Sequence, residues 1–184
     1  VQFSDEAVRR TIDEWMEVVE RDYNHPCIVT WVPLNESWGV PFISVDRRQQ
    51  EFSQTLYHLL KSFDSTRLVV GNDGWEMTET DLCAIHNYDH GEKNDEKAHA
   101  KFRESLSCRE ELLYTYTAGR KIFVDGWKDR GQPVLLTEFG GISFAEQDDK
   151  AWGYTCIRDG AELEKEYERI LDAICASDSI AGFC

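Results

Sequence analysis

The sequence has no long apolar run and far fewer basic than acidic side chains. No apolar stretch approaches the roughly 18 residues that a membrane-spanning helix requires. Apolar residues still make up 41% of the chain, so we expect a folded core. Lysine and arginine number 20 against 35 aspartates and glutamates, which gives a formal net charge of −15. Because nucleic-acid phosphates require a basic face, this deficit argues against a nucleic-acid partner.

Cysteine pairs at metal-binding spacing are also missing. No C-x-x-C pair occurs, and the six cysteines are scattered along the chain. Cys27 and Cys83 lie in apolar runs, where cysteine acts as a small hydrophobe. We therefore expect free thiols and a reducing compartment, which favours a cytoplasmic location. The six positions are Cys27, Cys83, Cys108, Cys156, Cys175 and Cys184.

Glycine-rich phosphate-binding turns are absent as well. Neither G-x-G-x-x-G nor G-x-x-x-x-G-K-[ST] occurs in the sequence. A doubly wound nucleotide-binding domain needs such a turn between a strand and a helix, so the sequence argues against that class.

Helical and strand patterns alternate along the chain. Apolar residues at helical spacing predict helices over 4–22, 46–63, 97–106, 109–127 and 161–176, and short apolar runs predict strands over 27–34, 68–70, 82–86, 134–137 and 180–184. Ser4 and Asp46 are placed to cap the first two helices. The segment 144–160 is interpreted as loop-rich. Alternation of this kind predicts an α/β domain over 1–184 with parallel strands joined by right-handed crossovers.

Two carboxylates follow buried strands directly. Asn35 and Glu36 end the apolar run 27–34, and Glu138 ends the run 133–137. In parallel α/β folds, ligands meet the carboxyl ends of the strands. Hydrolysis of a glycosidic bond requires two carboxyl groups, so two carboxylates at strand ends meet one requirement of that reaction.

The segments around both carboxylates resemble one known family. The run NHPCIVTWVPLNESWG at 24–39 resembles the acid/base strand of glycoside hydrolase family 2, and PVLLTEFGG at 133–141 resembles its nucleophile strand. HNY at 86–88 lies where the family has an active-site tyrosine, and IAGFC at 180–184 resembles the start of its last barrel strand. The resemblance implies a partial (β/α)8 TIM barrel that holds about strands four to eight, without the N-terminal strands.

The resemblance also implies roles for these residues. Glu36 is expected to be the acid/base and Glu138 the nucleophile of a retaining β-glycosidase, with their carboxyl groups about 5–5.5 Å apart. The acid must hold its proton while the nucleophile stays ionised. Tyr88 is the best candidate donor to the nucleophile, and Asn35 is the candidate partner of the sugar 2-hydroxyl.

Three further residues are candidates for substrate binding. Trp38 and Trp75 lie in loops at strand ends, where an exposed ring stacks on a sugar or merely packs in the loop. His86 is a ligand contact or a buried supporting histidine. His86, Asp89 and His90 also form a cluster, but its spacing fits no familiar zinc pattern, so we expect no metal and no cofactor.

Several alternatives stay open from the sequence. A non-catalytic carbohydrate-binding barrel fragment would keep the aromatic residues, but the presence of both glutamates favours an enzyme. A β-galactoside is the first expected substrate and a β-glucuronide the second, and neither follows from residues in this chain. A partial barrel exposes sheet edges at 27–34 and 180–184, which predicts a partner, either the missing barrel half or a second copy. We expect weak or no activity from this segment alone.

Overall fold

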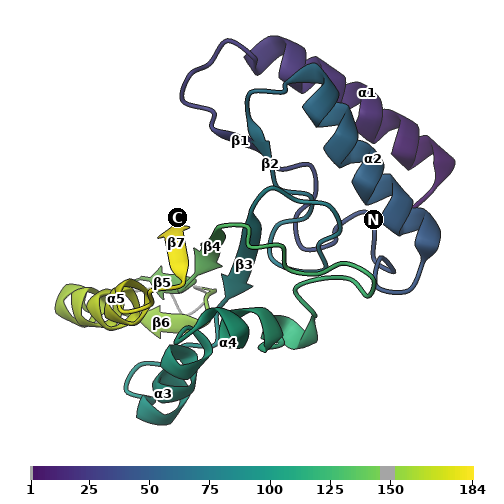
Figure 1. Ribbon diagram of the computed structural model, residues 1–184. Coiled ribbons are helices and arrows are strands. Elements are labelled where there is room, and N and C mark those ends of the chain that lie inside the picture. The colour runs from purple at the N-terminus through teal and green to yellow at the C-terminus, as the bar shows by residue number, and fades with distance from the viewer. Residues whose placement is uncertain (1, 146–151) are drawn as a thin grey trace. The chain divides into compact units, whose positions relative to one another are not determined.

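The computed structural model describes residues 2–145 and 152–184 (Figure 1). The chain divides into two compact units. Unit 1 comprises Val1–Ile85 and Arg120–Pro133, and unit 2 comprises His86–Gly119 and Val134–Cys184. That both belong to the single domain expected over 1–184 stays a prediction.

Unit 1 contains two long helices whose starts the sequence predicts correctly. Helix α1 spans Asp5–Asp22, and the hydroxyl of its N-cap residue Ser4 accepts a hydrogen bond from the amide of Ala7. Helix α2 spans Arg47–Phe63, and the carboxylate of Asp46 accepts from the amide of Arg48. Both caps satisfy amide groups that have no partner inside the helix.

The strands of unit 1 run parallel. Strand β1 (Thr30–Trp31) pairs with β2 (Leu68–Val69), and single bridges continue the pattern between Asn35 and Asp73 and between Gly74 and Ile85. The helices cover these strands with two apolar clusters, one around Leu34, Ile43 and Leu56, the other around Trp31, Leu60 and Val69. The core therefore fixes the segments that follow β1 and β2.

The first predicted strand is much shorter than expected. Only Thr30–Trp31 of the run 27–34 is a strand, Cys27 is exposed, and Val29 has 72% of its surface exposed. The expectation that the whole run forms a buried strand is therefore wrong, and Cys27 is not a core residue. The chain forms a turn at 26–27 before it reaches the core, so an apolar composition did not ensure burial.

Unit 2 holds the sheet that carries Glu138. Strand β3 (Cys83–Asn87) starts in unit 1 and ends in unit 2, and the sheet order is β3-β4-β7. Strand β4 spans Val134–Phe139 and pairs in parallel with β7 (Ile180–Phe183). The remaining elements of this unit are α3 (Glu96–Ser105), α4 (Arg109–Tyr114), the 3-10 turn η1 (Thr117–Gly119), β5 (Ile142–Phe144), β6 (Thr155–Ile157) and α5 (Gly160–Cys175).

Two predictions for unit 2 and its surroundings are corrected by the structure. The helix expected over 109–127 ends at Tyr114, because Thr115 is extended and Gly119 and Gly126 adopt positive φ angles. The segment 144–160, expected to be loop-rich, contributes to β5 and β6, which pair in parallel. Residues 146–151 of that segment lie outside the described residues.

The fold is α/β, and the strand pairs β1–β2 and β4–β7 are parallel, as predicted. The pair β5–β6, which the sequence did not predict, is parallel as well. Across residues 2–145 and 152–184 the strands form separate small sheets and no closed barrel. All six cysteines are free thiols, as expected. No helix in the described part of the chain is long and apolar enough to cross a membrane.

Candidate active site

Glu138 lies at the end of β4, next to the last residue of the strand. Leu136, two residues earlier, is fully buried and anchors the strand in the core. The side chain of Glu138 keeps 38% of its surface exposed. The strand therefore holds the carboxylate firmly while leaving it open to a ligand, which is what a nucleophile requires.

Two side chains from the end of β3 contact this carboxylate. The hydroxyl of Tyr88 donates a hydrogen bond to Oε2 of Glu138. Nδ1 of His86, a fully buried residue, lies 3.4 Å from the same oxygen. Both contacts orient the carboxylate, and the phenol supplies a donor to its negative charge. The structure thus brings three sequence-predicted site residues together in unit 2.

The ring of Tyr88 is held by a second tyrosine. Tyr88 and Tyr154 stack with ring centroids 4.4 Å apart and an interplanar angle of 17°. Gly141 makes room for this stack, because a Cβ at that position would lie 2.6 Å from Cδ2 of Tyr154 and 3.3 Å from Cδ1 of Tyr88. Sequence reasoning missed Tyr154, and only the pairing of β5 with β6 brings it to the site.

The turn after Glu138 depends on glycine and on a buried histidine. Gly140 and Gly141 both adopt positive φ angles, of 75° and 62°. Nε2 of the fully buried His90 lies 2.7 Å from the carbonyl oxygen of Gly140, and the carboxylate of Glu166 on α5 lies 3.8 Å from its Nδ1. His90 thus connects this turn to α5, whereas His86 contacts the carboxylate of Glu138.

Glu36 lies in unit 1 on a tight turn after β1. Its amide donates to the carbonyl of Asp73 at 2.9 Å, next to the bridge between Asn35 and Asp73. Glu36 and Ser37 both have positive φ angles, 51° and 60°, which non-glycine residues rarely adopt. Such backbone strain is found preferentially at functional sites, and here it is held by neighbouring contacts. Glu36 is half-buried and Asn35 is exposed.

A buried polar network supports that turn. The hydroxyl of Ser37 donates to Oε2 of Glu76 at 2.6 Å, and the side-chain amide of Asn72 donates to the same hydroxyl at 3.0 Å. The guanidinium of Arg120 lies 3.1 and 3.2 Å from the two carboxylate oxygens of Glu76. Because each of these groups is satisfied by another, the turn that presents Glu36 is rigid.

Sequence reasoning did not find this network. The available signal was Asn72, a polar residue that follows the apolar run 68–70 after one glycine, just as Glu36 follows the run 27–34 after one residue. Arg120 had no such signal, because the sequence predicts a helix over its segment, 109–127.

The two candidate tryptophans differ in exposure. Trp38 has 65% of its surface exposed and remains available for stacking on a ligand. Trp75 is 8% exposed, so of the two possibilities that the sequence left open for this residue, its burial favours packing in the loop. Its backbone carbonyl accepts a hydrogen bond from the side-chain amide of Asn72. Trp75 therefore belongs to the network that supports the turn at Glu36. A binding role for either tryptophan stays a prediction.

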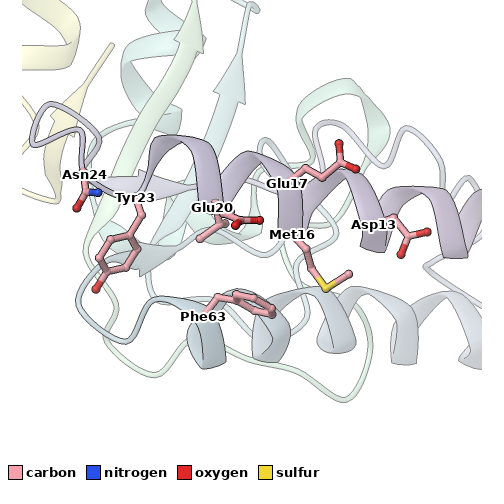
Figure 2. A pocket seen from close by; sticks show the side chains of 8 residues that line it. Asp13, Met16, Glu17, Glu20, Tyr23, Asn24 and Phe63 are labelled. Atoms are coloured by element: carbon pink, nitrogen blue, oxygen red, sulfur yellow. The ribbon is translucent and has the colours of Figure 1, made fainter.

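Two grooves in the described part of the chain have linings that do not include the predicted site residues. A groove of about 850 Å³ runs along α1 and the end of α2, where Met16 and Phe63 face each other beneath the acidic side chains Asp13 and Glu17 (Figure 2). A smaller one of about 330 Å³ in unit 2 is lined by Phe139, Gly140 and apolar residues of α5. Neither groove is lined by a residue that the sequence predicts to be catalytic or to bind substrate.

Comparison with known proteins finds a matching family model and similar solved structures. The family model described as "Glycosyl hydrolases family 2, TIM barrel domain" matches residues 3–147. A comparison with curated proteins finds no match. Similar solved structures include β-glucuronidases from Faecalibacterium prausnitzii and from an uncultured Clostridium species, each at 19% identity and a TM-score of 0.62.

A third similar structure is a family 2 β-galacturonidase from Eisenbergiella tayi bound to glycerol, at 17% identity and a TM-score of 0.59. The alignments cover 96% of this chain but only 27%, 28% and 28% of the three larger chains. At these identities the likeness establishes a shared fold.

Proposed function

The chain belongs to glycosyl hydrolase family 2, and from this premise we propose that it carries the catalytic pair of a retaining β-glycosidase. The observation that supports the proposal best is the hydrogen bond from Tyr88 to Glu138 at the exposed end of β4. A carboxylate that is open to solvent, fixed by a strand and oriented by a phenol has the properties of a nucleophile.

In the proposed mechanism, Glu138 attacks the anomeric carbon of a terminal β-linked sugar. Glu36 gives its proton to the glycosidic oxygen as the bond to the leaving alcohol breaks, which leaves a glycosyl ester on Glu138. Glu36, now ionised, removes a proton from water as the water oxygen attacks the same carbon. The sugar is released with its original configuration, Glu138 is free again, and Glu36 is protonated again.

Supporting residues have defined parts in this proposal. Tyr88 keeps the nucleophile oriented, and His86 adds a second contact to the same oxygen. Asn35, exposed beside the acid, offers its amide to the sugar 2-hydroxyl, a contact of the kind that strengthens in the transition state. Trp38 offers an apolar ring for the C–H face of the substrate.

The substrate is proposed to be a terminal β-glycoside. The first expected substrate is a galactoside and the second a glucuronide, although neither follows from residues in this chain. Two of the similar structures are named β-glucuronidase and the third is named β-galacturonidase. A substrate panel should therefore include β-glucuronides and β-galacturonides as well as β-galactosides.

The proposal includes a partial barrel. The parallel pairs, the alternation with helices and the family description support an assignment of β1, β2, β3, β4 and β7 to barrel strands four to eight. Eight strands close such a barrel. We therefore propose that further strands, from another segment or from a second copy, complete it and contribute sugar contacts.

A panel of p-nitrophenyl β-glycosides tests the proposed function on the intact protein. Glu138→Gln should abolish turnover of every substrate. Glu36→Gln should retain turnover of aryl glycosides with good leaving groups, because these need little acid assistance, and lose that of alkyl glycosides. An equal loss on both kinds would contradict the role of Glu36. Inversion of configuration in the released sugar, seen by NMR, would contradict a retaining mechanism.

The alternative is a barrel fragment that binds carbohydrate without cleaving it. Calorimetric binding of a glycoside with no release of p-nitrophenol from any member of the panel would favour this reading over the enzyme. The oriented carboxylate of Glu138 argues against it, because carbohydrate binding alone does not need a phenol aimed at an acid.

A further inference from the structure

Three aromatic rings of unit 2 form a continuous series that begins at the nucleophile. Tyr88 contacts Glu138 through its hydroxyl and stacks on Tyr154 through its ring. Trp152 in turn contacts Tyr154, with ring centroids 5.6 Å apart and planes inclined at 60°. The series therefore leads away from the candidate nucleophile in two steps.

Exposure rises along this series. Tyr88 is half-buried, Tyr154 has 51% of its surface exposed, and Trp152 has 81% exposed. An exposed indole offers a large apolar area that a ligand can cover, and covering such an area favours binding. Because the planes of Tyr154 and Trp152 are inclined to one another, the two rings present their faces in different directions.

The backbone beneath the two outer rings is closely fitted. The amide of Tyr154 donates to the carbonyl of Gly141 at 2.9 Å. A Cβ at Gly153 would lie 2.8 Å from that carbonyl oxygen and 2.8 Å from the amide of Ser143, so only glycine lets the segment lie this close. The parallel pairing of β5 with β6 continues the contact, which fixes Tyr154 relative to Glu138.

We propose that Tyr154 and Trp152 form a binding subsite for the aglycone, the part of the substrate that leaves. This inference rests on the proposed function. In an enzyme that removes terminal sugars, the sugar that reacts is enclosed around the nucleophile, whereas the leaving group extends toward solvent. The outward rise in exposure assigns the outer rings to the leaving group. Their chemistry selects aglycones with a flat apolar face, either an aryl ring or the C–H face of a second sugar.

The subsite is tested by comparing an aryl with a methyl β-glycoside of the same sugar on the intact protein. Trp152→Ala should lower the aryl-to-methyl ratio of kcat/KM by about three- to tenfold, the range expected for one aromatic contact. Trp152→Phe should restore part of that ratio. Tyr114→Ala removes another aromatic residue of unit 2, one that is 72% exposed on α4, and should leave the ratio as in the wild type.

Inhibition by thioglycosides gives a second readout that does not depend on bond cleavage. Phenyl β-thioglycoside should lose affinity in Trp152→Ala by a similar factor, and methyl β-thioglycoside should not. A disaccharide with the same terminal sugar distinguishes the two ligand sources. If the variant impairs the aryl substrate alone, the subsite binds aryl aglycones, and if it impairs both, the subsite also binds a second sugar.

The outcomes separate this inference from the function on which it rests. Unchanged ratios and inhibition constants in Trp152→Ala, in a protein that still hydrolyses glycosides, would overturn the subsite and leave the glycosidase in place. Failure of the wild-type protein to hydrolyse any glycoside would overturn the proposed function, and the aglycone subsite with it.

Discussion

Tyr88 donates its phenolic hydrogen bond to Oε2 of Glu138, a residue that is 50 positions further along the chain. The two side chains meet because β3 and β4 are neighbours in the sheet order β3-β4-β7 and end at the same edge. Parallel strands present their carboxyl ends together, so a donor after one strand reaches an acid at the end of the next.

Replacing Tyr88 by phenylalanine tests this contact. Tyr88→Phe keeps the ring that stacks on Tyr154 but removes the donor to the carboxylate. A hydrogen bond to a charged group contributes about 1.5–3 kcal/mol, so kcat/KM of the intact protein for aryl β-glycosides should fall roughly ten- to a hundredfold. Tyr114→Phe removes an exposed phenol of the same unit as the control. A Tyr88→Phe enzyme with wild-type kinetics would show that the phenol does not assist Glu138.

The glycine pair after Glu138 offers a matched comparison. Gly140 and Gly141 both have positive φ, so alanine at either position costs about 1 kcal/mol of backbone strain. Only at Gly141 does the added Cβ meet the rings of Tyr154 and Tyr88, because nothing lies within 4 Å of a Cβ at Gly140. Gly141→Ala should therefore reduce kcat/KM more than Gly140→Ala, at similar thermal stability. Equal kinetic losses would mean that the aromatic stack does not matter to catalysis.

The network below Glu36 predicts a loss of stability on a small change. Ser37→Ala removes the hydroxyl that donates to the buried carboxylate of Glu76. Of the two side chains described above as contacting this carboxylate, Arg120 then remains. Loss of one partner of a buried polar group costs about 1–3 kcal/mol, measured as the free energy of unfolding in urea.

Ser62→Ala is the control for this measurement. The hydroxyl of Ser62 donates to the carbonyl of Leu59 on the exposed side of α2, so its loss should change the free energy of unfolding little. If the two variants unfolded at the same urea concentration as the wild type, the network would not support the turn.

Asp64 predicts how the stability of unit 1 depends on pH. Burial alone would raise the pKa of this carboxyl, but hydrogen bonds from Thr66, Arg67 and Trp31 outweigh it and hold the pKa well below its ordinary value of 3.8. The folded state therefore keeps the carboxylate ionised where the unfolded chain takes up a proton. The resulting stabilisation is complete above pH 3.8 and is lost as the pH falls toward the lowered pKa.

Urea unfolding at pH 7, 5 and 3 measures this dependence. The wild type should unfold at clearly lower urea concentration at pH 3 than at pH 5, and Asp64→Asn should be less stable at pH 7 with a smaller further loss at pH 3. Asp13→Asn, at an exposed position of α1, should follow the wild type. An Asp64→Asn variant as sensitive to acid as the wild type would exclude Asp64 as the cause.

Local sequence chemistry predicted the elements that depend on neighbours in the chain. Ser4 and Asp46 cap their helices as expected, because capping involves amides only two or three residues away. Local sequence chemistry failed for elements whose structure depends on whether their apolar side chains are buried. The run 27–34 is apolar, yet Val29 is exposed, and the helix expected over 109–127 ends at Tyr114. Whether an apolar residue is covered depends on segments that are distant in the sequence.

The candidate site divides in the same way. The sequence by itself determined that the carboxylates Glu36 and Glu138 lie at the ends of apolar runs, because a strand end is a local property. Tyr88 as the donor to Glu138 followed from the family resemblance, and the contact itself depends on β3 and β4 being neighbours in the sheet. Only the tertiary structure decided that Ser37, Asn72, Glu76 and Arg120 share one buried network, that Trp75 is covered, and that Tyr154 lies on Tyr88. Those contacts join segments separated by tens of residues, and only packing of the folded chain brings such segments within hydrogen-bonding or van der Waals distance.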